Sequence, residues 1–241
     1  MPQKNQAVKI TMTEKEFTQQ RIRSFVRRDG RMTDAQRRVL VELWPQFGLT
    51  TVDGEIDFVK VFGRDAPRVL EIGFGSGYSL LEIARAHPQK DFIGIETYQP
   101  GVGTLLLGIE QHQMTNIRIF YTDAVEVLQR SIAAESLDGI QIFFPDPWPK
   151  RRHHKRRLIQ PEFVNLVTEK LKPKGIFHLA TDWEHYAKQM LEVLSESENL
   201  INLAGAGNFS PRSAQRPVVT KFEQRGTKSG RPIWELQFAR S

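Results

Sequence analysis

Short apolar segments alternate with amphipathic stretches through the middle of the chain. The apolar segments predict strands at Arg68–Ile72, Asp91–Glu96, Ile117–Tyr121, Gly139–Phe144 and Gly175–Ala180. The stretches between and after them predict helices at Tyr78–His87, Pro100–Gln113, Ala124–Ser131, Pro161–Leu171 and Trp183–Ser195. Strands that are separated by single helices predict an α/β fold with a mostly parallel, doubly wound sheet that is covered on both faces.

The two ends of the chain depart from this alternation. Leu200–Ala204 and Ile233–Phe238 predict a closing antiparallel strand pair with a long polar loop between them. Near the other end, Thr33-Asp34-Ala35-Gln36 has the capping-box pattern. We therefore expect a helix that starts there and stops before Pro45.

The composition narrows the class of protein. With 241 residues and 39% hydrophobic content the chain can form a full core, and its net charge of +6 favours a polyanionic partner. The absence of Cys excludes disulfides and thiolate metal sites and fits a reducing cytoplasm. No apolar run reaches the roughly 18 residues that would span a bilayer. Because the N-terminus also lacks an apolar signal core, we expect a cytoplasmic protein that does not enter the membrane.

Arginine is concentrated near the N-terminus, between Arg21 and Arg38. The planar guanidinium suits phosphate, so we interpret this segment as a phosphate-binding arm in which Arg27 and Arg28 contact RNA. A solvated surface arm is the alternative. We divide the chain into a basic N-terminal arm and helix at residues 1–50 and an α/β domain at residues 51–241.

Acidic residues stand in or just after the predicted parallel strands. They are Glu71, Glu96, Asp123, Asp146 and Asp182. In a doubly wound sheet, ligands bind at the carboxyl ends of the strands, near the point where strand order reverses. These acids are therefore the first candidates for binding and catalysis.

A glycine-rich turn, Glu71-Ile72-Gly73-Phe74-Gly75-Ser76-Gly77, follows the first of these strands. The dinucleotide fingerprint needs its third glycine where this chain has Tyr78, which disfavours NAD without excluding it. Glu96 stands where an acid takes both ribose hydroxyls, and Asp123 can accept from an adenine amino group. These residues suggest an adenosine ligand without phosphates, for which S-adenosylmethionine is the obvious candidate. The alternative is that Glu96 and Asp123 only cap helices.

The three glycines of this turn are Gly73, Gly75 and Gly77. Glycine lets the backbone turn sharply and pass close to a ligand. We therefore expect all three glycines to bind the cofactor.

A prolyl-acid turn follows the strand at Gly139–Phe144. Asp146 lies between Pro145 and Pro147, with Trp148 next to it. A rigid acid beside an aromatic plane suits a pocket for a flat polar ring. The turn partly matches the Asn/Asp-Pro-Pro-aromatic tetrad of enzymes that methylate exocyclic base amines, but its second proline is displaced. A tight turn with a packed Trp148 is the alternative.

A basic block from Lys150 to Arg157 comes next, with no acid to balance it. Beside a candidate active-site mouth it favours a nucleic-acid track over a solvated loop. The predicted RNA contacts in the block are Arg151, Arg152, Lys155, Arg156 and Arg157. His153 and His154 lack partners at zinc spacing, so we predict no metal site.

Six motifs together resemble one known family. They are Arg21-Ile22-Arg23-Ser24-Phe25-Val26-Arg27-Arg28, Glu71-Ile72-Gly73-Phe74-Gly75, Pro100-Gly101-Val102-Gly103, Phe143-Phe144-Pro145-Asp146-Pro147-Trp148, Ala180-Thr181-Asp182-Trp183 and Thr220-Lys221-Phe222-Glu223-Gln224-Arg225-Gly226. From about Arg21 to its end, the chain resembles the bacterial tRNA (guanine-N7-)-methyltransferases.

The resemblance implies a Rossmann-like class I methyltransferase fold. It implies methyl transfer from S-adenosylmethionine to N7 of the guanosine at tRNA position 46, in the variable loop, with S-adenosylhomocysteine as the product. Implied cofactor contacts are Glu71, Glu96, Asp123 and Asp146, of which Asp146 is also catalytic. Implied substrate contacts are Lys150, Asp182, Thr220, Lys221, Phe222 and Glu223.

Several alternatives stay open from the sequence. Asp146 accepts hydrogen bonds either from guanine N1–H and the amino group or from the cofactor's amino end, and Asp182 and Glu223 are rivals for reading guanine. The rival functions are a base-amine methyltransferase, a non-catalytic RNA-binding protein and, third, an NAD-dependent oxidoreductase. The sequence leaves open whether the protein is a monomer or a homodimer.

Overall fold

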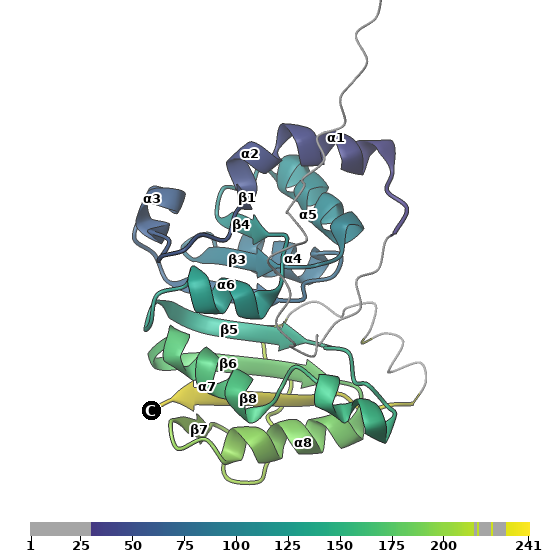
Figure 1. Cartoon of the computed structure of the whole chain (residues 1–241), viewed down its shortest axis with the longest axis vertical. Coiled ribbons are helices and arrows are strands. Elements are labelled where there is room, and N and C mark those ends of the chain that lie inside the picture. Colours follow the sequence, from purple (N-terminus) through teal and green to yellow (C-terminus); the bar gives the residue numbers. More distant parts are fainter. Residues whose placement is uncertain (1–29, 215, 217–222, 224–229) are drawn as a thin grey trace, which may run out of the picture.

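A single mixed sheet runs through the described part of the chain (Figure 1). The computed structural model describes residues 30–214, 216, 223 and 230–241. The sheet has the strand order β1-β4-β3-β2-β5-β6-β8-β7. Its strands are β1 (Gly48–Leu49), β2 (Arg68–Ile72), β3 (Asp91–Ile95), β4 (Ile117–Phe120), β5 (Leu137–Phe143), β6 (Leu171–Thr181), β7 (Leu200–Asn202) and β8 (Trp234–Arg240).

The direction of the strands confirms the predicted topology. All neighbours from β1 to β6 are parallel, whereas β8 pairs antiparallel with both β6 and β7. Strand order reverses between β2 and β5, because the chain adds β3 and β4 on one side of β2 and β5 and β6 on the other. The loops at the carboxyl ends of β2 and β5 therefore border the place where ligands bind in such sheets.

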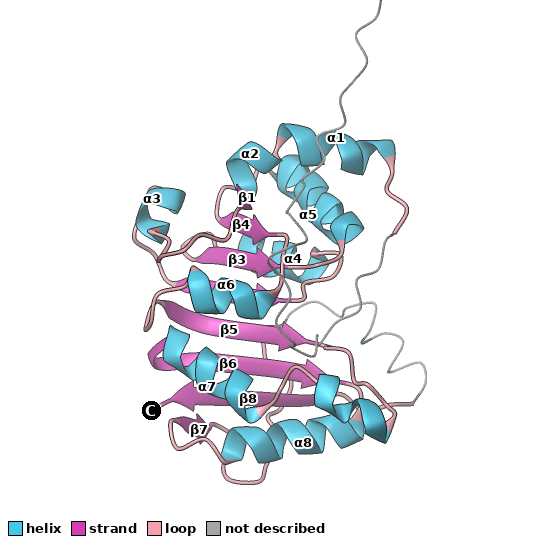
Figure 2. Ribbon diagram, viewed as in Figure 1, coloured by secondary structure: helices cyan, strands magenta, loops and turns pink. Residues whose placement is uncertain are grey.

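Helices cover both faces of the sheet (Figure 2). They are α1 (Asp34–Glu42), α2 (Trp44–Phe47), α3 (Phe58–Phe62), α4 (Tyr78–Ala86), α5 (Gln99–His112), α6 (Ala124–Arg130), α7 (Pro161–Lys170) and α8 (Glu184–Ser195). A 3-10 helix, η2 (Arg151–Arg156), lies between β5 and α7. Within the described residues, no helix has the length and apolar character that a membrane crossing requires.

Each face of the sheet has its own hydrophobic core. One core gathers side chains of α6, α7 and α8, and the other gathers side chains of α1, α4 and α5. Within β3, Phe92 enters the second core while Ile93 enters the first. This split follows from the alternation of side chains along a strand, and it explains why the strands have near-continuous apolar sequences.

The start of β6 differs from the prediction. The sequence Lys172-Pro173-Lys174-Gly175 is typical of a loop, so the strand was expected only from Gly175. In the structure β6 begins at Leu171, which pairs with Leu137, and the register shifts before Gly139 pairs with Ile176. The polar segment is therefore an irregularity inside a strand pair, where Pro and Gly are tolerated.

The capping box at the start of α1 is confirmed. The backbone N–H of Gln36 donates to Thr33 Oγ1 over 3.2 Å, and that of Thr33 donates to Gln36 Oε1 over 2.9 Å. The side-chain amide of Gln36 also donates to the carbonyl of Pro100 at the start of α5. Arg38 pairs with Glu110 near the end of α5. The described part of residues 1–50 is thus fixed to the α/β domain.

We predict that Thr33→Ala lowers the free energy of unfolding by about 1 kcal/mol, because it removes the acceptor for a backbone N–H at the helix start. Urea unfolding followed by circular dichroism measures this change. Thr33→Ser, which keeps the hydroxyl, serves as the control and stays near wild type. Equal losses in the two variants would contradict the capping role.

Candidate functional site

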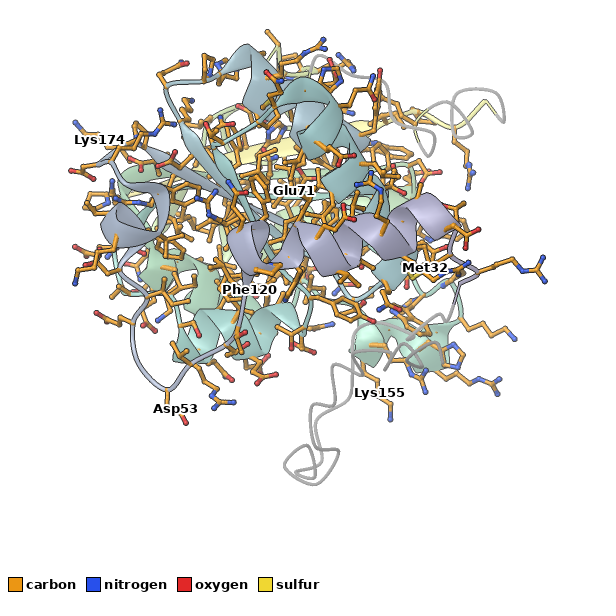
Figure 3. All side chains as sticks on the ribbon, turned by 90° about the horizontal axis from the view of Figure 1, so that it is seen from above. Met32, Asp53, Glu71, Phe120, Lys155 and Lys174 are labelled. Carbon is orange, nitrogen blue, oxygen red and sulfur yellow. The ribbon has the colours of Figure 1, made fainter. Side chains whose placement is uncertain are left out.

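A buried carboxyl group lies where strand order reverses. Glu71 of β2 is opposite Gln141 of β5 in the parallel register, and Gln141 Nε2 donates to Glu71 Oε2 over 2.7 Å. Glu71 is only 2% exposed and lies in the interior of the molecule (Figure 3). Burial raises the pKa of Glu71 to about 7, although the hydrogen bond from Gln141 opposes this rise. Sequence reasoning missed Gln141, whose signal was a single amide in an otherwise apolar strand.

The glycine turn after β2 has the backbone conformation that glycine permits. Gly73, Gly75 and Gly77 all have positive φ, between 60° and 74°. A Cβ atom added at Gly73 or Gly75 would meet nothing within 4 Å, so the backbone there is open to a ligand. At Gly101 in α5, an added Cβ would approach the Gly75 carbonyl oxygen to 1.9 Å. Gly101 therefore lets α5 pack directly onto the turn.

Glu96 connects this turn to the end of β3. Its Oε2 atom accepts from the Gly75 N–H over 2.7 Å, and its Oε1 atom accepts from the N–H groups of Thr97 and Tyr98 over 2.6 Å and 3.0 Å. Burial raises the pKa of Glu96 despite these hydrogen bonds. The carboxylate is half-buried and stands beside the open glycine backbone, where it can accept further hydrogen bonds from a ligand.

Asp123 follows β4 and begins α6. Its Oδ1 atom accepts from the Val125 N–H over 2.8 Å, so Asp123 is the N-cap that one reading of the sequence proposed. The side chain is half-buried at the same edge of the sheet as the glycine turn. A cofactor contact by Asp123 stays a prediction.

The loop after β5 carries Asp146 in an exposed position. The backbone is left-handed at Phe144, where φ is 53°, and again at Trp148, where φ is 44°. Positive φ at an aromatic residue is strained and persists only where the surroundings hold it. The segment from Phe144 to Trp148 is called the acceptor loop below.

The basic block forms η2, a short 3-10 helix directly after the acceptor loop. Its exposed side chains are Arg151, Arg152, Lys155 and Arg156, and Lys150 just before it is also exposed. The Arg156 guanidinium lies 4.9 Å from the Trp148 ring centre, and the His153 ring meets the indole edge-on at 5.8 Å. One face of the indole is thus covered by a cation of the block.

Arg157 corrects the prediction that the whole block faces RNA. Its side chain is 2% exposed, since its guanidinium turns inward over the Tyr186 ring, 4.8 Å from the ring centre. Its Nε donates to the carbonyl of Pro147 over 2.9 Å, and its Nη1 donates to Gln189 Oε1 over 2.5 Å. Arg157 therefore supports the acceptor loop from the interior, through the Pro147 carbonyl.

The two other predicted substrate acids have cationic partners. Asp182, after β6, pairs with Arg231 over 3.1 Å. Glu223 is 5% exposed and pairs with Arg216 over 2.5 Å and with Arg212 over 3.0 Å. Arg216, absent from the predicted site, is fully buried. Its sequence signal was weak, because a lone arginine before a proline in a polar loop resembles many surface residues.

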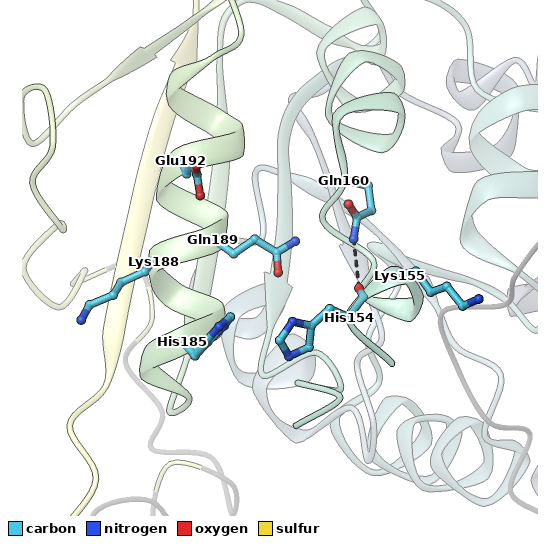
Figure 4. Close-up of a pocket in the computed structure, with 7 residues that line it drawn as sticks. All are labelled: His154, Lys155, Gln160, His185, Lys188, Gln189 and Glu192. Atoms are coloured by element: carbon cyan, nitrogen blue, oxygen red, sulfur yellow. Dashed lines mark hydrogen bonds between the residues drawn. The ribbon is translucent and has the colours of Figure 1, made fainter. Parts of the chain in front are cut away.

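A cavity of about 460 Å³ lies between η2 and α8 (Figure 4). It is lined by His154, Lys155, Gln160, His185, Lys188, Gln189 and Glu192. The rings of His154 and His185 are 4.7 Å apart, and Gln160 donates to the His154 carbonyl over 3.1 Å. No residue of the glycine turn lines this cavity, so the two are separate places in the molecule. Among the predicted site residues, Lys155 alone belongs to the lining.

Some predicted residues fall outside the described part of the chain. They are Arg27, Arg28, Thr220, Lys221 and Phe222. Their assignments stay predictions. Among the residues that the structure does describe, no three or more His, Asp or Glu side chains gather as a metal site would require.

Comparison with known proteins agrees with this geometry. Residues 65–236 match the model of a family described as putative methyltransferases. The tRNA (guanine-N(7)-)-methyltransferase of Nitrosococcus oceani is 53% identical over 234 residues, which cover 96% of this chain and 97% of that protein. The chain belongs to the tRNA (guanine-N(7)-)-methyltransferase family. The family's protein from Pseudomonas syringae pathovar tomato is 55% identical over 218 residues, which cover 90% and 89% of the two chains.

A solved structure shows the same fold at low sequence identity. The 16S rRNA methyltransferase KamB aligns with a TM-score of 0.56 and 12% identity, over 80% of this chain and 100% of that one. At this identity the likeness concerns the fold alone. It confirms the class I methyltransferase architecture, and the family membership rests on the tRNA methyltransferase relatives.

We predict that Glu71→Gln flattens the decline in stability with rising pH. A carboxyl whose folded pKa is raised stabilises the fold most below its unfolded pKa, and this contribution is lost as pH rises through the folded value. At about 1.4 kcal/mol per pKa unit, a rise from 4.5 to about 7 corresponds to roughly 3 kcal/mol of unfolding free energy.

Urea unfolding of both proteins across about pH 4.5 to 8 tests this linkage. The difference in unfolding free energy between Glu71→Gln and wild type should grow in favour of the variant over that range. Glu55→Gln, at an exposed position, is the control and follows the wild-type curve. A difference that stays constant with pH would show that folding does not raise the pKa of Glu71.

Proposed function

We propose that this protein transfers a methyl group from S-adenosylmethionine to N7 of guanosine 46 in the variable loop of tRNA. The observation that carries the proposal is the arrangement across the strand reversal. An open glycine turn with Glu71 and Glu96 lies on the β2 side, and the acceptor loop with Asp146 and the basic helix η2 lies on the β5 side. Family membership supplies the substrate.

The residues at β2 and β3 fit S-adenosylmethionine. The open backbone at Gly73 and Gly75 accommodates a ligand at close range, and the carboxylate of Glu96 suits a ribose diol. Since the turn lacks the third glycine of dinucleotide sites, an adenosine without a pyrophosphate fits better than NAD. When bound, the cofactor supplies a methyl group on a positively charged sulfur.

The acceptor atom requires alignment rather than a base. Guanine N7 has an in-plane lone pair and no proton, so the N7–carbon bond forms as the carbon–sulfur bond breaks and no proton needs to leave. Positive charge passes to the guanine, so the task of the protein is to align the ring and to place negative charge near it. Asp146 fulfils this role, either by accepting from guanine N1–H and the amino group or by holding the cofactor.

The exposed cations of η2 provide the RNA surface. Lys150, Arg151, Arg152, Lys155 and Arg156 are all exposed in or next to η2, directly after the acceptor loop, and are called the basic face here. Such a face binds phosphates with a strong dependence on salt. A flipped-out guanine held beside Asp146 would have its flanking phosphates within reach of this face.

The decisive assay uses labelled S-adenosylmethionine and unmodified tRNA, followed by cleavage chemistry specific for N7-methylguanine. A single cut in the variable loop is the expected result. Incorporation of label without this cut would identify a base-amine methyltransferase. Salt-sensitive tRNA binding without incorporation would identify a binding protein.

We predict that Asp146→Asn lowers kcat/KM by about 10- to 100-fold, because a hydrogen bond to a charged group contributes about 1.5–3 kcal/mol. Steady-state methyl transfer to tRNA measures the loss. Asp138→Asn, near the opposite end of β5, is the matched control and leaves kcat/KM near wild type. Wild-type turnover and guanine selectivity in Asp146→Asn would refute the role.

We predict that Arg151→Gln and Arg152→Gln each reduce the slope of log affinity for tRNA against log salt by about 1, since each exposed arginine neutralises about one phosphate. Cofactor affinity should stay unchanged. Lys60→Gln on α3 is the control for loss of an exposed charge elsewhere. An unchanged slope across the η2 series would mean that the basic face is only solvated.

A further inference from the structure

A buried ion cluster ties the last part of the chain to the sheet. Arg216 is 0% exposed, Glu223 is 5% exposed and Glu235 is 2% exposed. Arg216 Nη1 donates to Glu223 Oε2 over 2.5 Å, and Arg216 Nη2 donates to Glu235 Oε2 over 3.1 Å. Two carboxylates thus share one guanidinium. Because unpaired charge is very unfavourable in the interior, each member depends on the others.

Glu235 fixes this cluster to the sheet. It lies in β8 opposite Ala180 of β6, and its Oε1 atom contacts His178 Nε2 over 2.6 Å and accepts from the Ser213 N–H over 2.8 Å. Burial alone would raise the pKa of Glu235, but the hydrogen bond with His178 and the nearby charges hold it below its usual value. The Glu235 carboxylate, which anchors Arg216, therefore stays ionised at neutral pH.

Glu223 is oriented toward Arg216. Its Oε1 atom accepts from Arg212 Nε over 3.0 Å, while its Oε2 atom accepts from Arg216. These hydrogen bonds hold the pKa of Glu223 below its usual value although burial opposes them. To contact a base directly, the carboxylate would have to leave this buried pair.

The same guanidinium also touches the start of the acceptor loop. Arg216 lies 5.7 Å from the ring centres of both Phe143 and Phe144, within the range of cation–π attraction. Phe144 has the strained φ of 53°, and its N–H donates to the Ala180 carbonyl over 2.8 Å. Asp146 follows two residues later. The position of Arg216 thus bears directly on where the acceptor loop leaves β5.

We propose that Arg216 is a positioning residue for the acceptor loop and that Glu223 acts on methyl transfer through Arg216 rather than by contact with guanine. The inference rests on the proposed function, and it deepens it by assigning a role to two residues of the same site. Glu235 is the anchor that sets the guanidinium against Phe143 and Phe144. A direct reading of guanine by Glu223 is the competing outcome.

A double-mutant cycle separates the two roles. We expect Arg216→Lys and Glu223→Gln each to lower kcat at least tenfold, with the affinities for S-adenosylmethionine and tRNA within about twofold of wild type. The kcat of the double variant should be no more than about twofold below that of the slower single variant, because both changes remove the same interaction. The proposal would be overturned if the losses in kcat of the two single variants multiplied in the double variant. A loss of selectivity for guanine over adenine in Glu223→Gln would also overturn it.

Amide hydrogen exchange supplies a readout that does not need activity. In Arg216→Lys the Phe144 N–H should lose at least tenfold of its protection, while amides of β2 keep theirs. Uniform loss over the sheet, or unchanged Phe144 protection, would refute a positioning role. This measurement stands even if wild-type protein methylates no tRNA, a result that would refute the proposed function separately.

Arg64→Lys is the matched control. Arg64 donates to buried Asp91 at the amino end of β3, over 2.9 Å and 2.6 Å, far from the acceptor loop along the sheet. Its loss should lower stability without changing kcat or Phe144 exchange. Should Arg216→Lys fail to fold, Glu223→Gln decides alone: reduced Phe144 protection with intact guanine selectivity supports the proposal, and the reverse pattern overturns it.

Discussion

The parallel pairing of β2 with β5 is the constraint from which the arrangement of the site follows. β3 and β4 extend the sheet on one side of this pair and β6 and β8 on the other, so the loops after β2 and β5 lead away in opposite directions. The glycine turn and the acceptor loop consequently lie on the two sides of the strand reversal. A shift in the register of this one pair would separate Glu71 from Gln141 and displace both loops.

Buried polar contacts hold the backbone of the acceptor loop where hydrophobic packing alone would not specify it. Arg157 holds the Pro147 carbonyl from beneath, and Arg216 lies against Phe144 at the start of the loop. Both guanidinium groups are almost fully buried, and both have oriented acceptors. Planar, multidentate arginine can maintain a strained backbone in a way that a lysine at the same place would not.

The alternating strands and helices from β2 to α8 could be predicted because each depends on local pattern, whereas the short elements β1, α2, α3 and η2 were not predicted. β2 matches its predicted range, and the parallel strands beside it end within one residue of theirs, because a buried strand needs a continuous apolar run. The acids at the strand ends followed from those boundaries. Arg156 and Arg157 show what local pattern cannot predict. They are adjacent arginines, yet Arg156 covers the Trp148 ring and Arg157 is buried over the Tyr186 ring. Only the turn of η2 against α8 decides between them.

The most direct test of the account is a crystal structure of the protein with S-adenosylhomocysteine. The account predicts the ribose hydroxyls within hydrogen-bond distance of Glu96, the ligand against the backbone of Gly73 and Gly75, and its sulfur directed toward the loop that carries Asp146. Electron density for the ligand in the cavity between η2 and α8, or at any place away from the β2–β5 reversal, would contradict it.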